Sequence, residues 1–313
     1  MIKFFPLILI ALLLSFSESH AYSLVNMGSD FKIYVNIYRN SKFDEQWSGW
    51  KVFEKKYQKY FDAAICDSSD GDCESAKKTH LKEFFTQLPN FESEMWTIFD
   101  NANILSDNQI LQFKIYFPDT PTDVPIVFMP SLLTFNGKGG VQIDGTYTLV
   151  IGADLAALRK NNMKVLFSHE FFHTYQFGKL TGAPLFQTLA SPLWFEGLAV
   201  WVSEKLNPEA SDADILMSQD LATYCASNEH VIGMAKDYKS FLPMKYSDPT
   251  ADSIKSDWFY ANGNALPHRR GYCLGLQVVR ELNKTMPIFS VVGDDESKFS
   301  ELINKSLDSM TAF

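Results

Sequence analysis

A short segment with two histidines one helical turn apart is the feature that most restricts how this chain can fold. The segment LFSHEFFHTYQFG, residues 166–178, places His169, Glu170 and His173 in the order H-E-x-x-H. On an α-helix, residues four apart project from the same face, so both imidazoles can turn a ring nitrogen toward one point. The segment therefore predicts a helix with a candidate metal-binding face, around which other elements must be arranged.

The chemistry of these three side chains favours zinc. Imidazole nitrogens bind Zn²⁺ at about 2.0–2.1 Å, and a catalytic zinc ion has three protein ligands and one open position. Glu170 lies about 100° around the helix from His169, which suits a role beside the ion better than a place among its ligands. A carboxylate there can take a proton from an attacking water. We therefore predict that His169 and His173 bind one Zn²⁺ ion and that Glu170 is the general base.

A third ligand is offered by the segment SPLWFEGLAVWVSEKL, in which Glu196 follows His173 by 23 residues. A loop containing Gly182 and Pro184 would let a returning helix bring this carboxylate to the ion, and we expect Gly197 to allow the two helices to approach closely. Large apolar neighbours predict that Glu196 is buried, and a buried charge needs a partner. The alternative is a solvated carboxylate favoured by the helix dipole.

Together, HEFFH and WFEGLAVW resemble the gluzincin metallopeptidases, in which HExxH is followed by a glutamate inside an E-G-L/F-A type helix. The segment RRGYCLG, residues 269–275, is similar to the R-x-G-Y-x-L-G segment of bacterial zinc-dependent peptidases of this kind. The resemblance covers roughly residues 120–283. It implies three zinc ligands, His169, His173 and Glu196, in an enzyme that acts on peptide or protein substrates with Glu170 as its base.

The resemblance also implies a zincin-like α+β fold, in which a mixed or antiparallel sheet lies over the active-site helix and a mainly helical part follows. The G-x-M-E-N segment of membrane-alanyl-type aminopeptidases is absent, with GGVQIDG in the comparable region, and so is the N-E-x-x-S-D helix of the thermolysin type. The mechanism therefore carries over, but neither aminopeptidase activity nor thermolysin-like specificity does. A non-catalytic secreted zinc module and a zinc hydrolase of cell-wall peptides remain alternatives.

A peptidase of this type usually has an electrophile that stabilises the oxyanion. Four side chains are candidates: Tyr272, Tyr260, His268 and Arg270. Tyr272 matches the resemblance and stands at the start of a predicted helix, so we predict that it is catalytic. The alternative is a tyrosine packed in the core.

Hydrophobic patterns predict the remaining elements. The alternation in FKIYVNIY, residues 31–38, predicts a strand, and residues 43–115 are mostly helical. VPIVFMP predicts a strand, and GKGGVQIDGTYTLVIGADL predicts a glycine turn, a strand, a tight turn at Asp144-Gly145 and a further strand. That last strand is either an interior strand or the edge at which an extended substrate pairs.

Capping residues predict where the later helices begin and end. The first begins at Asn161 or Asn162 and ends at Gly178, and the second has Ser191 as N-cap and Pro192 at its first position. Further helices are expected over residues 271–283 and around Phe299 to Leu307, with loops around 245–268.

Strands before residue 152 and helices after it predict an α+β fold. We divide the chain into a signal peptide (1–21), an N-terminal mostly helical region (22–120) and a zincin-like catalytic domain (121–313), with the sheet and active-site helix in 121–178 and the helical part in 179–313.

The N-terminus predicts export. Lys3, the apolar run FFPLILIALLLSF and the SHA site ending at Ala21 are typical of a secretory signal peptide, so we expect a secreted or periplasmic protein without stable membrane insertion after cleavage. An uncleaved anchor is the alternative. The net charge of −9 and the lack of a basic stripe exclude a nucleic-acid partner.

Four cysteines in an exported chain suggest two disulfides. Cys66 and Cys73 flank the turn-forming segment DSSDGD, so we pair these two, and Cys225 with Cys273 follows by elimination. Other pairings and free thiols are possible from the sequence alone.

Overall fold

The centre of the molecule is a mixed four-stranded sheet, in agreement with the predicted α+β class. The structure is a computed structural model that describes residues 22–65, 72–121, 123–180, 185–260, 263 and 267–312. The strand order is β1-β2-β4-β3. The pairs β1–β2 and β2–β4 are parallel, and β4–β3 is antiparallel. The strands are β1 (Leu24–Asn26), β2 (Ile126–Met129), β3 (Gly137–Ile143) and β4 (Thr146–Gly152).

The predicted hairpin is present as β3 and β4. The turn residue Asp144 has φ 50° and Gly145 has φ 78°, as a tight hairpin turn requires. The predicted glycine turn at its start is wrong, because residues 137–140 belong to β3. The register between β3 and β4 shifts between Lys138 and Val141, so the extra glycines form a bulge within the strand.

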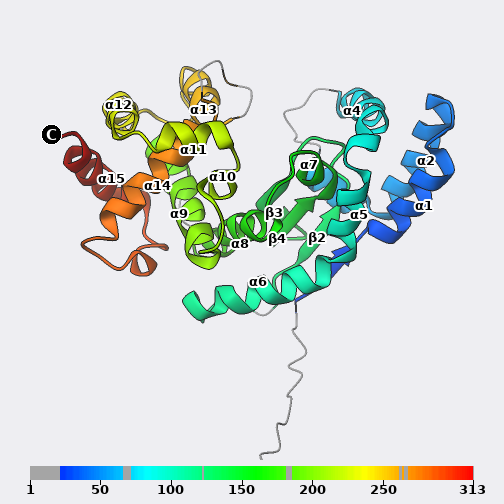
Figure 1. Ribbon diagram of the computed structural model, residues 1–313, viewed down its shortest axis with the longest axis horizontal. Coiled ribbons are helices and arrows are strands. Elements are labelled where there is room, and N and C mark those ends of the chain that lie inside the picture. Colours follow the sequence, from blue (N-terminus) through cyan, green and yellow to red (C-terminus); the bar gives the residue numbers. More distant parts are fainter. Residues whose placement is uncertain are drawn as a thin grey trace, which may run out of the picture.

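Helices α1 to α5 gather at one end of the sheet, and α6 runs beneath it toward the C-terminal helices (Figure 1). Their core is aromatic: the Phe31 ring lies 5.4 Å from those of Phe53 and Phe84 and 6.4 Å from that of Trp50. The bounds are α1 (Gly28–Tyr38), α2 (Phe43–Lys56), α3 (Gln58–Ala64), α4 (Cys73–Gln87), α5 (Glu92–Asp100), α6 (Ala102–Tyr116) and α7 (Ala153–Leu158), with a 3₁₀ turn at Leu88–Asn90.

The predicted strand over residues 31–38 is wrong, because this segment is part of α1. Phe31, Tyr34 and Val35 are buried, whereas Ile33 and Ile37 are exposed. This spacing of buried positions, i, i+3 and i+4, is that of a helix packed on one face. The same residues are compatible with the alternation of a strand and with the spacing of a helix, and packing against the aromatic core favours the helix.

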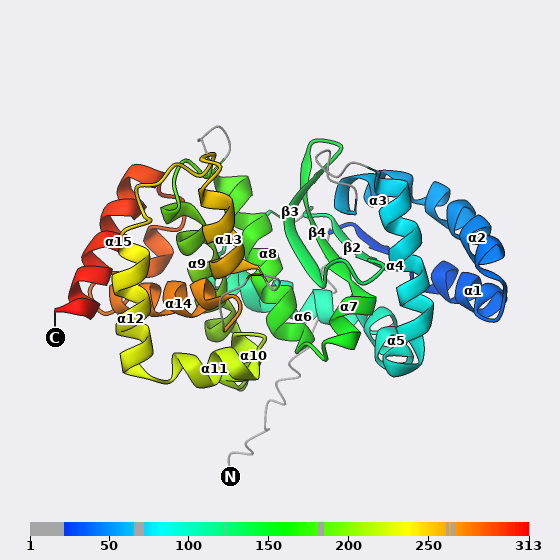
Figure 2. The ribbon, with the colours of Figure 1, turned by 90° about the horizontal axis from the view of Figure 1, so that it is seen from above.

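The HExxH segment forms the central helix α8 (Met163–Lys179), which lies between the sheet and the C-terminal helices (Figure 2). The predicted N-cap is confirmed, since the Asn162 side chain accepts a hydrogen bond from the Lys164 N–H at 3.2 Å. The helix passes the predicted end at Gly178 and continues to Lys179. All residues from Val165 to Gln176 are buried, because β3 and β4 pack on this helix from one side and α9 packs from the other.

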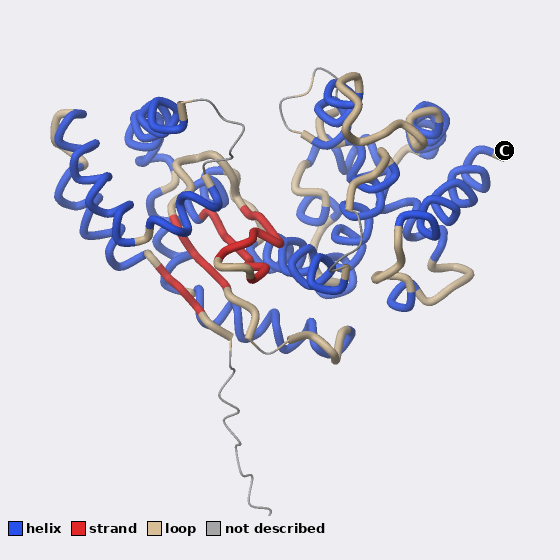
Figure 3. Tube along the Cα trace, turned by 180° about the vertical axis from the view of Figure 1, so that it is seen from behind, coloured by secondary structure: helices blue, strands red, loops and turns tan. Residues whose placement is uncertain are grey.

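A helical part follows α8, as expected, and occupies the opposite side of the molecule from α1 and α2 (Figure 3). The predicted loop around 245–268 is wrong in part, because buried Ala251, Trp258 and Phe259 hold a helix there. The helices are α9 (Ala190–Leu206), α10 (Asp212–Ile215), α11 (Gln219–Cys225), α12 (Asn228–Lys239), α13 (Ala251–Phe259), α14 (Arg270–Leu282) and α15 (Glu296–Thr311), with a 3₁₀ turn at Ile288–Ser290.

The start of α9 is set by a carboxylate from the far end of the chain. Ser191 is the second residue of α9 and not its cap, and its hydroxyl donates to Glu296 at 2.7 Å. Glu296 also accepts from the backbone N–H groups of Gln187 and Thr188, at 2.8 and 2.7 Å. The buried Glu296 therefore fixes the loop that leads into the helix carrying Glu196.

Gly197 serves a different contact from the one expected. A Cβ atom on Gly197 would lie 2.6 Å from the Gly275 backbone, and one on Gly275 would lie 2.7 Å from the Gly197 Cα. The two glycines therefore let α9 and α14 cross in backbone contact. The prediction that Gly197 brings α9 close to α8 was wrong, and the contact instead positions α14, which carries Tyr272.

The predicted disulfide between Cys225 and Cys273 is present and joins α11 to α14. The second predicted pair, Cys66 with Cys73, involves Cys66, which lies outside the described residues. The cysteine bond is typical of proteins that fold in an oxidising compartment. Within the described residues, no helix is long and apolar enough to span a bilayer.

Loss of the Cys225–Cys273 bond is expected to destabilise the protein by about 4 kcal/mol, because the bond closes a loop of 48 residues and restricts the unfolded chain. The free energy of unfolding of the double variant Cys225→Ser/Cys273→Ser, compared with wild type in urea, measures this. The double variant removes only this bond, whereas a chemical reductant would also act on Cys73. Equal unfolding midpoints with equal slopes would contradict the expectation.

Candidate metal centre

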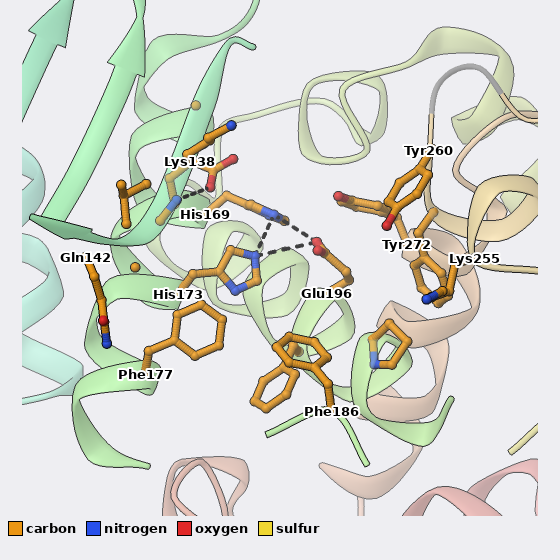
Figure 4. Close-up of a pocket in the computed structure, with 18 of the residues that line it drawn as sticks. Lys138, Gln142, His169, His173, Phe177, Phe186, Glu196, Lys255, Tyr260 and Tyr272 are labelled. Carbon is orange, nitrogen blue, oxygen red and sulfur yellow. Dashed lines mark hydrogen bonds and ion pairs between the residues drawn. The ribbon is translucent and has the colours of Figure 1, made fainter. Parts of the chain in front are cut away.

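The three predicted ligands meet at one point. The Nε2 atoms of His169 and His173 are 3.2 Å apart, and Glu196 Oε2 lies 3.2 Å from the first and 3.5 Å from the second. Figure 4 shows the three side chains directed toward one another. Among the described residues, this is a group of side chains that could hold a metal ion.

The spacing of these donor atoms fits a small tetrahedral ion. Four ligands at 2.0–2.1 Å from Zn²⁺ would be separated by about 3.3 Å along each edge of the tetrahedron. The three separations in the structure, 3.2, 3.2 and 3.5 Å, lie close to that edge. Two nitrogens and one oxygen also form a donor set that zinc accepts, with a fourth position left for another ligand.

The electrostatics of the cluster also favour a cation. Glu196 is only partly buried, with 22% of its side chain exposed, whereas His173 is buried. Desolvation disfavours the charged form of both groups, yet the pKa of each is shifted toward its charged form. The neighbouring imidazoles hold the pKa of Glu196 well below its usual value, and the Glu196 carboxylate raises the pKa of His173. The site thus attracts positive charge, which a proton or a metal ion can supply.

The orientation of the two imidazoles comes from aromatic stacking. The Nδ1 atoms of His169 and His173 are buried, and no described residue accepts a hydrogen bond from them. Ligating histidines usually donate this N–H to a carboxylate or carbonyl. Here the His169 ring stacks on Tyr272 with centroids 5.7 Å apart, and the His173 ring stacks on Phe177 with centroids 6.0 Å apart. The two stacked rings restrict how each imidazole can rotate.

Glu170 lies beside the cluster without belonging to it. Its side chain lines the same cavity as the three donors but is not one of the converging ligand groups. Glu170 Oε2 accepts a hydrogen bond from the Gly139 N–H at 2.8 Å. A Cβ atom on Gly139 would lie 2.1 Å from the Glu170 carbonyl oxygen, so only glycine lets β3 approach α8 this closely. The glycines of GKGG are the sequence signal for this contact.

The cavity over the cluster has a volume of about 520 Å³, within the range of small-molecule and peptide sites. Residues 137–142 of β3 form one wall, and Tyr260 and Tyr272 belong to the opposite, C-terminal side (Figure 4). Several lining residues were not anticipated from the sequence, because they belong to no recognised motif: Lys138, Phe177, Phe186, Tyr246, Lys255 and Phe259.

The candidate electrophiles differ in their placement. Tyr272 and Tyr260 line the cavity, although Tyr260 is 49% exposed. His268 is exposed, and the Arg270 guanidinium lies over the Trp258 ring at 4.0 Å. Burial raises the pKa of Tyr272 strongly. The positive charge of Arg269 lowers this pKa, whereas the negative charges of Glu196 and Glu170 raise it further. Tyr272 therefore keeps its proton at neutral pH and can donate a hydrogen bond into the cavity.

Residues 147–152 of the segment YTLVIGADL lie in β4, which is interior between β2 and β3, and the last three residues of the segment begin α7. The edge strand beside the cluster is β3.

Comparison of the chain with protein-family models, curated proteins and solved structures gave no match.

Proposed function

We propose that the protein is an exported, zinc-dependent metallopeptidase of gluzincin type with a zincin-like catalytic domain. The observation that carries the proposal is the meeting of His169, His173 and Glu196 at tetrahedral spacing, with Glu170 in the same cavity. A structural zinc site is normally closed by four protein ligands. Three converging ligands beside a carboxylate and a large cavity favour catalysis instead.

His169, His173 and Glu196 would hold the ion. When bound, zinc supplies Lewis-acid polarisation of a carbonyl and lowers the pKa of a water ligand to about 7. Glu170 takes a proton from the attacking water and delivers it to the leaving amine. The Gly139 N–H fixes one oxygen of that carboxylate and leaves the other for the proton. The protonated Tyr272 donates a hydrogen bond to the carbonyl oxygen as negative charge develops there.

A peptide substrate is favoured by the edge of the sheet. Strand β3 is at the edge, and its residues 137–142 line the cavity. An extended peptide can add to such an edge through main-chain hydrogen bonds, which do not depend on its sequence. A peptide bound in this way would have a backbone carbonyl beside the metal cluster.

Removal of metal is the direct test. We expect the purified protein to contain one zinc ion per chain, to cleave an unstructured peptide, and to lose cleavage in a chelator that zinc reverses. The midpoint of thermal unfolding should also fall on chelation, because an ion that binds only the folded state stabilises it. Metal content is measured by mass spectrometry and cleavage by chromatography. A protein that takes up no zinc would contradict the proposal, and one that holds zinc without cleaving peptides would be a non-catalytic zinc module.

A further inference from the structure

Arg269 contacts Tyr272, which lines the cavity over the metal cluster, and has no carboxylate partner among the described residues. Its guanidinium carbon is 3.9 Å from the centroid of the Tyr272 ring, and that ring stacks on His169. The guanidinium is therefore separated from a metal ligand by one aromatic side chain. No Asp or Glu pairs with it in the part of the chain that the structure describes, whereas Arg39 and Arg280 are both ion-paired.

The backbone of Arg269 is also unusual. Its φ is 60° and its ψ 26°, a left-handed conformation that favours glycine, and its side chain makes no hydrogen bond that caps α14. Local preference therefore does not explain an arginine at this position. Sparsely populated backbone conformations of this kind gather at functional sites, where the surrounding structure maintains them.

A second cation, Arg159, interacts electrostatically with Arg269. Burial and the charge of Arg269 both lower the pKa of Arg159, at the end of α7, so the two guanidinium groups lie within electrostatic reach. No described carboxylate pairs with Arg159 either. Burial lowers the pKa of Arg269, but Tyr272, Glu196 and Glu170 raise it on balance. The carboxylates whose charge reaches Arg269 are therefore those of Glu196 and Glu170 at the candidate metal site, and neither forms an ion pair with it among the described residues.

We propose that Arg269 binds a carboxylate of the substrate close to the cleaved bond and thereby selects which peptides are hydrolysed. The planar guanidinium matches a carboxylate with two parallel hydrogen bonds, and a partly buried position strengthens them. The carboxylate comes either from the C-terminus of the peptide or from an Asp or Glu side chain. This inference rests on the proposed peptidase function.

The test compares matched peptides and matched variants. The zinc-loaded protein is given a neutral peptide with a C-terminal amide, the same peptide with a free C-terminal carboxylate, and amidated peptides with Asp at successive positions. A carboxylate that reaches Arg269 should raise kcat/KM by about 10- to 100-fold, the usual contribution of a hydrogen bond to a charged group. Preference for the free C-terminus identifies an exopeptidase, and preference for Asp identifies an acidic side chain.

Arg269→Gln should remove this preference, and Arg269→Lys should retain part of it. Arg39→Gln causes the same change in net charge but lies far from the site, so it should leave the preference intact. Equal cleavage of all peptides by wild type, or a preference that persists in Arg269→Gln, would overturn the inference.

Arg269→Gly separates recognition from a structural role. Glycine suits the left-handed backbone, so the midpoint of thermal unfolding should not fall and zinc should be retained, while the preference is lost. If Arg269 only supported Tyr272, this variant would unfold at a lower temperature and cleave all peptides more slowly by the same factor, which would contradict the inference.

A measurement of peptide binding tests the carboxylate site separately from the proposed peptidase activity. Calorimetry measures the affinity of the zinc-loaded protein for the acid and amide peptides whether or not they are cleaved. Tighter binding of a carboxylate-bearing peptide that Arg269→Gln abolishes would support the carboxylate site even if no peptide were hydrolysed. Equal binding of acid and amide peptides by wild type would reject the site, even in an active peptidase.

Discussion

Glu170→Gln will abolish peptide cleavage while leaving the bound metal in place. Glutamine keeps the shape of the side chain and can still accept the Gly139 N–H, but it cannot take a proton from water. Loss of a general base typically lowers kcat by about 10²- to 10⁴-fold. Since Glu170 is not one of the converging donors, the zinc content should equal that of wild type.

The measurement combines metal analysis with steady-state kinetics on one peptide. Glu94→Gln, on the exposed surface of α5, is the matched control for the same chemical change and should behave as wild type. If Glu170→Gln kept full activity with zinc bound, Glu170 would not be the base. If it lost both activity and zinc, Glu170 would contribute to the metal site itself.

Glu196→Gln should lower the affinity for zinc by at least about 100-fold. Removing a group that only orients a ligand typically costs 10- to 100-fold, and the loss of a charged ligand should cost more. Glu196 supplies the negative charge of the cluster, and its pKa lies well below its usual value despite partial burial, because His173 and His169 hold it ionised. Neutral glutamine offers a weaker oxygen donor and no charge.

Competition with a chromogenic zinc chelator measures this affinity. Glu204→Gln is the control on the same helix, because Glu204 pairs with Arg280 and is not one of the converging donors. Unchanged zinc affinity in Glu196→Gln would reduce the site to two histidines and remove the main support for a catalytic ion.

Local sequence signals predicted the elements that carry the site. The Asn162 cap begins α8, Asp144-Gly145 forms the hairpin turn, and the apolar pattern after residue 270 forms α14. Each of these signals depends on residues within about one turn or one hairpin, so it can be recognised from the sequence alone.

The predictions failed where a distant segment decided the outcome. FKIYVNIY alternates well enough for a strand, but the aromatic rings of α2 and α4 pack on Phe31 and favour a helix. Ser191 is a good N-cap by type, yet Glu296 binds its hydroxyl from more than a hundred residues away. Gly197 contacts Gly275 of α14, which no local pattern indicates.

The sequence by itself determined that His169 and His173 share a helix face with Glu170 one step around it, because the helical repeat places residues four apart together. Only the tertiary structure decided that Glu196 completes the cluster, that Tyr272 stacks on His169, and that Arg269 lies over Tyr272. These contacts depend on how α9 and α14 pack against α8. Such packing is settled by the whole core at once, and no short stretch of residues encodes it.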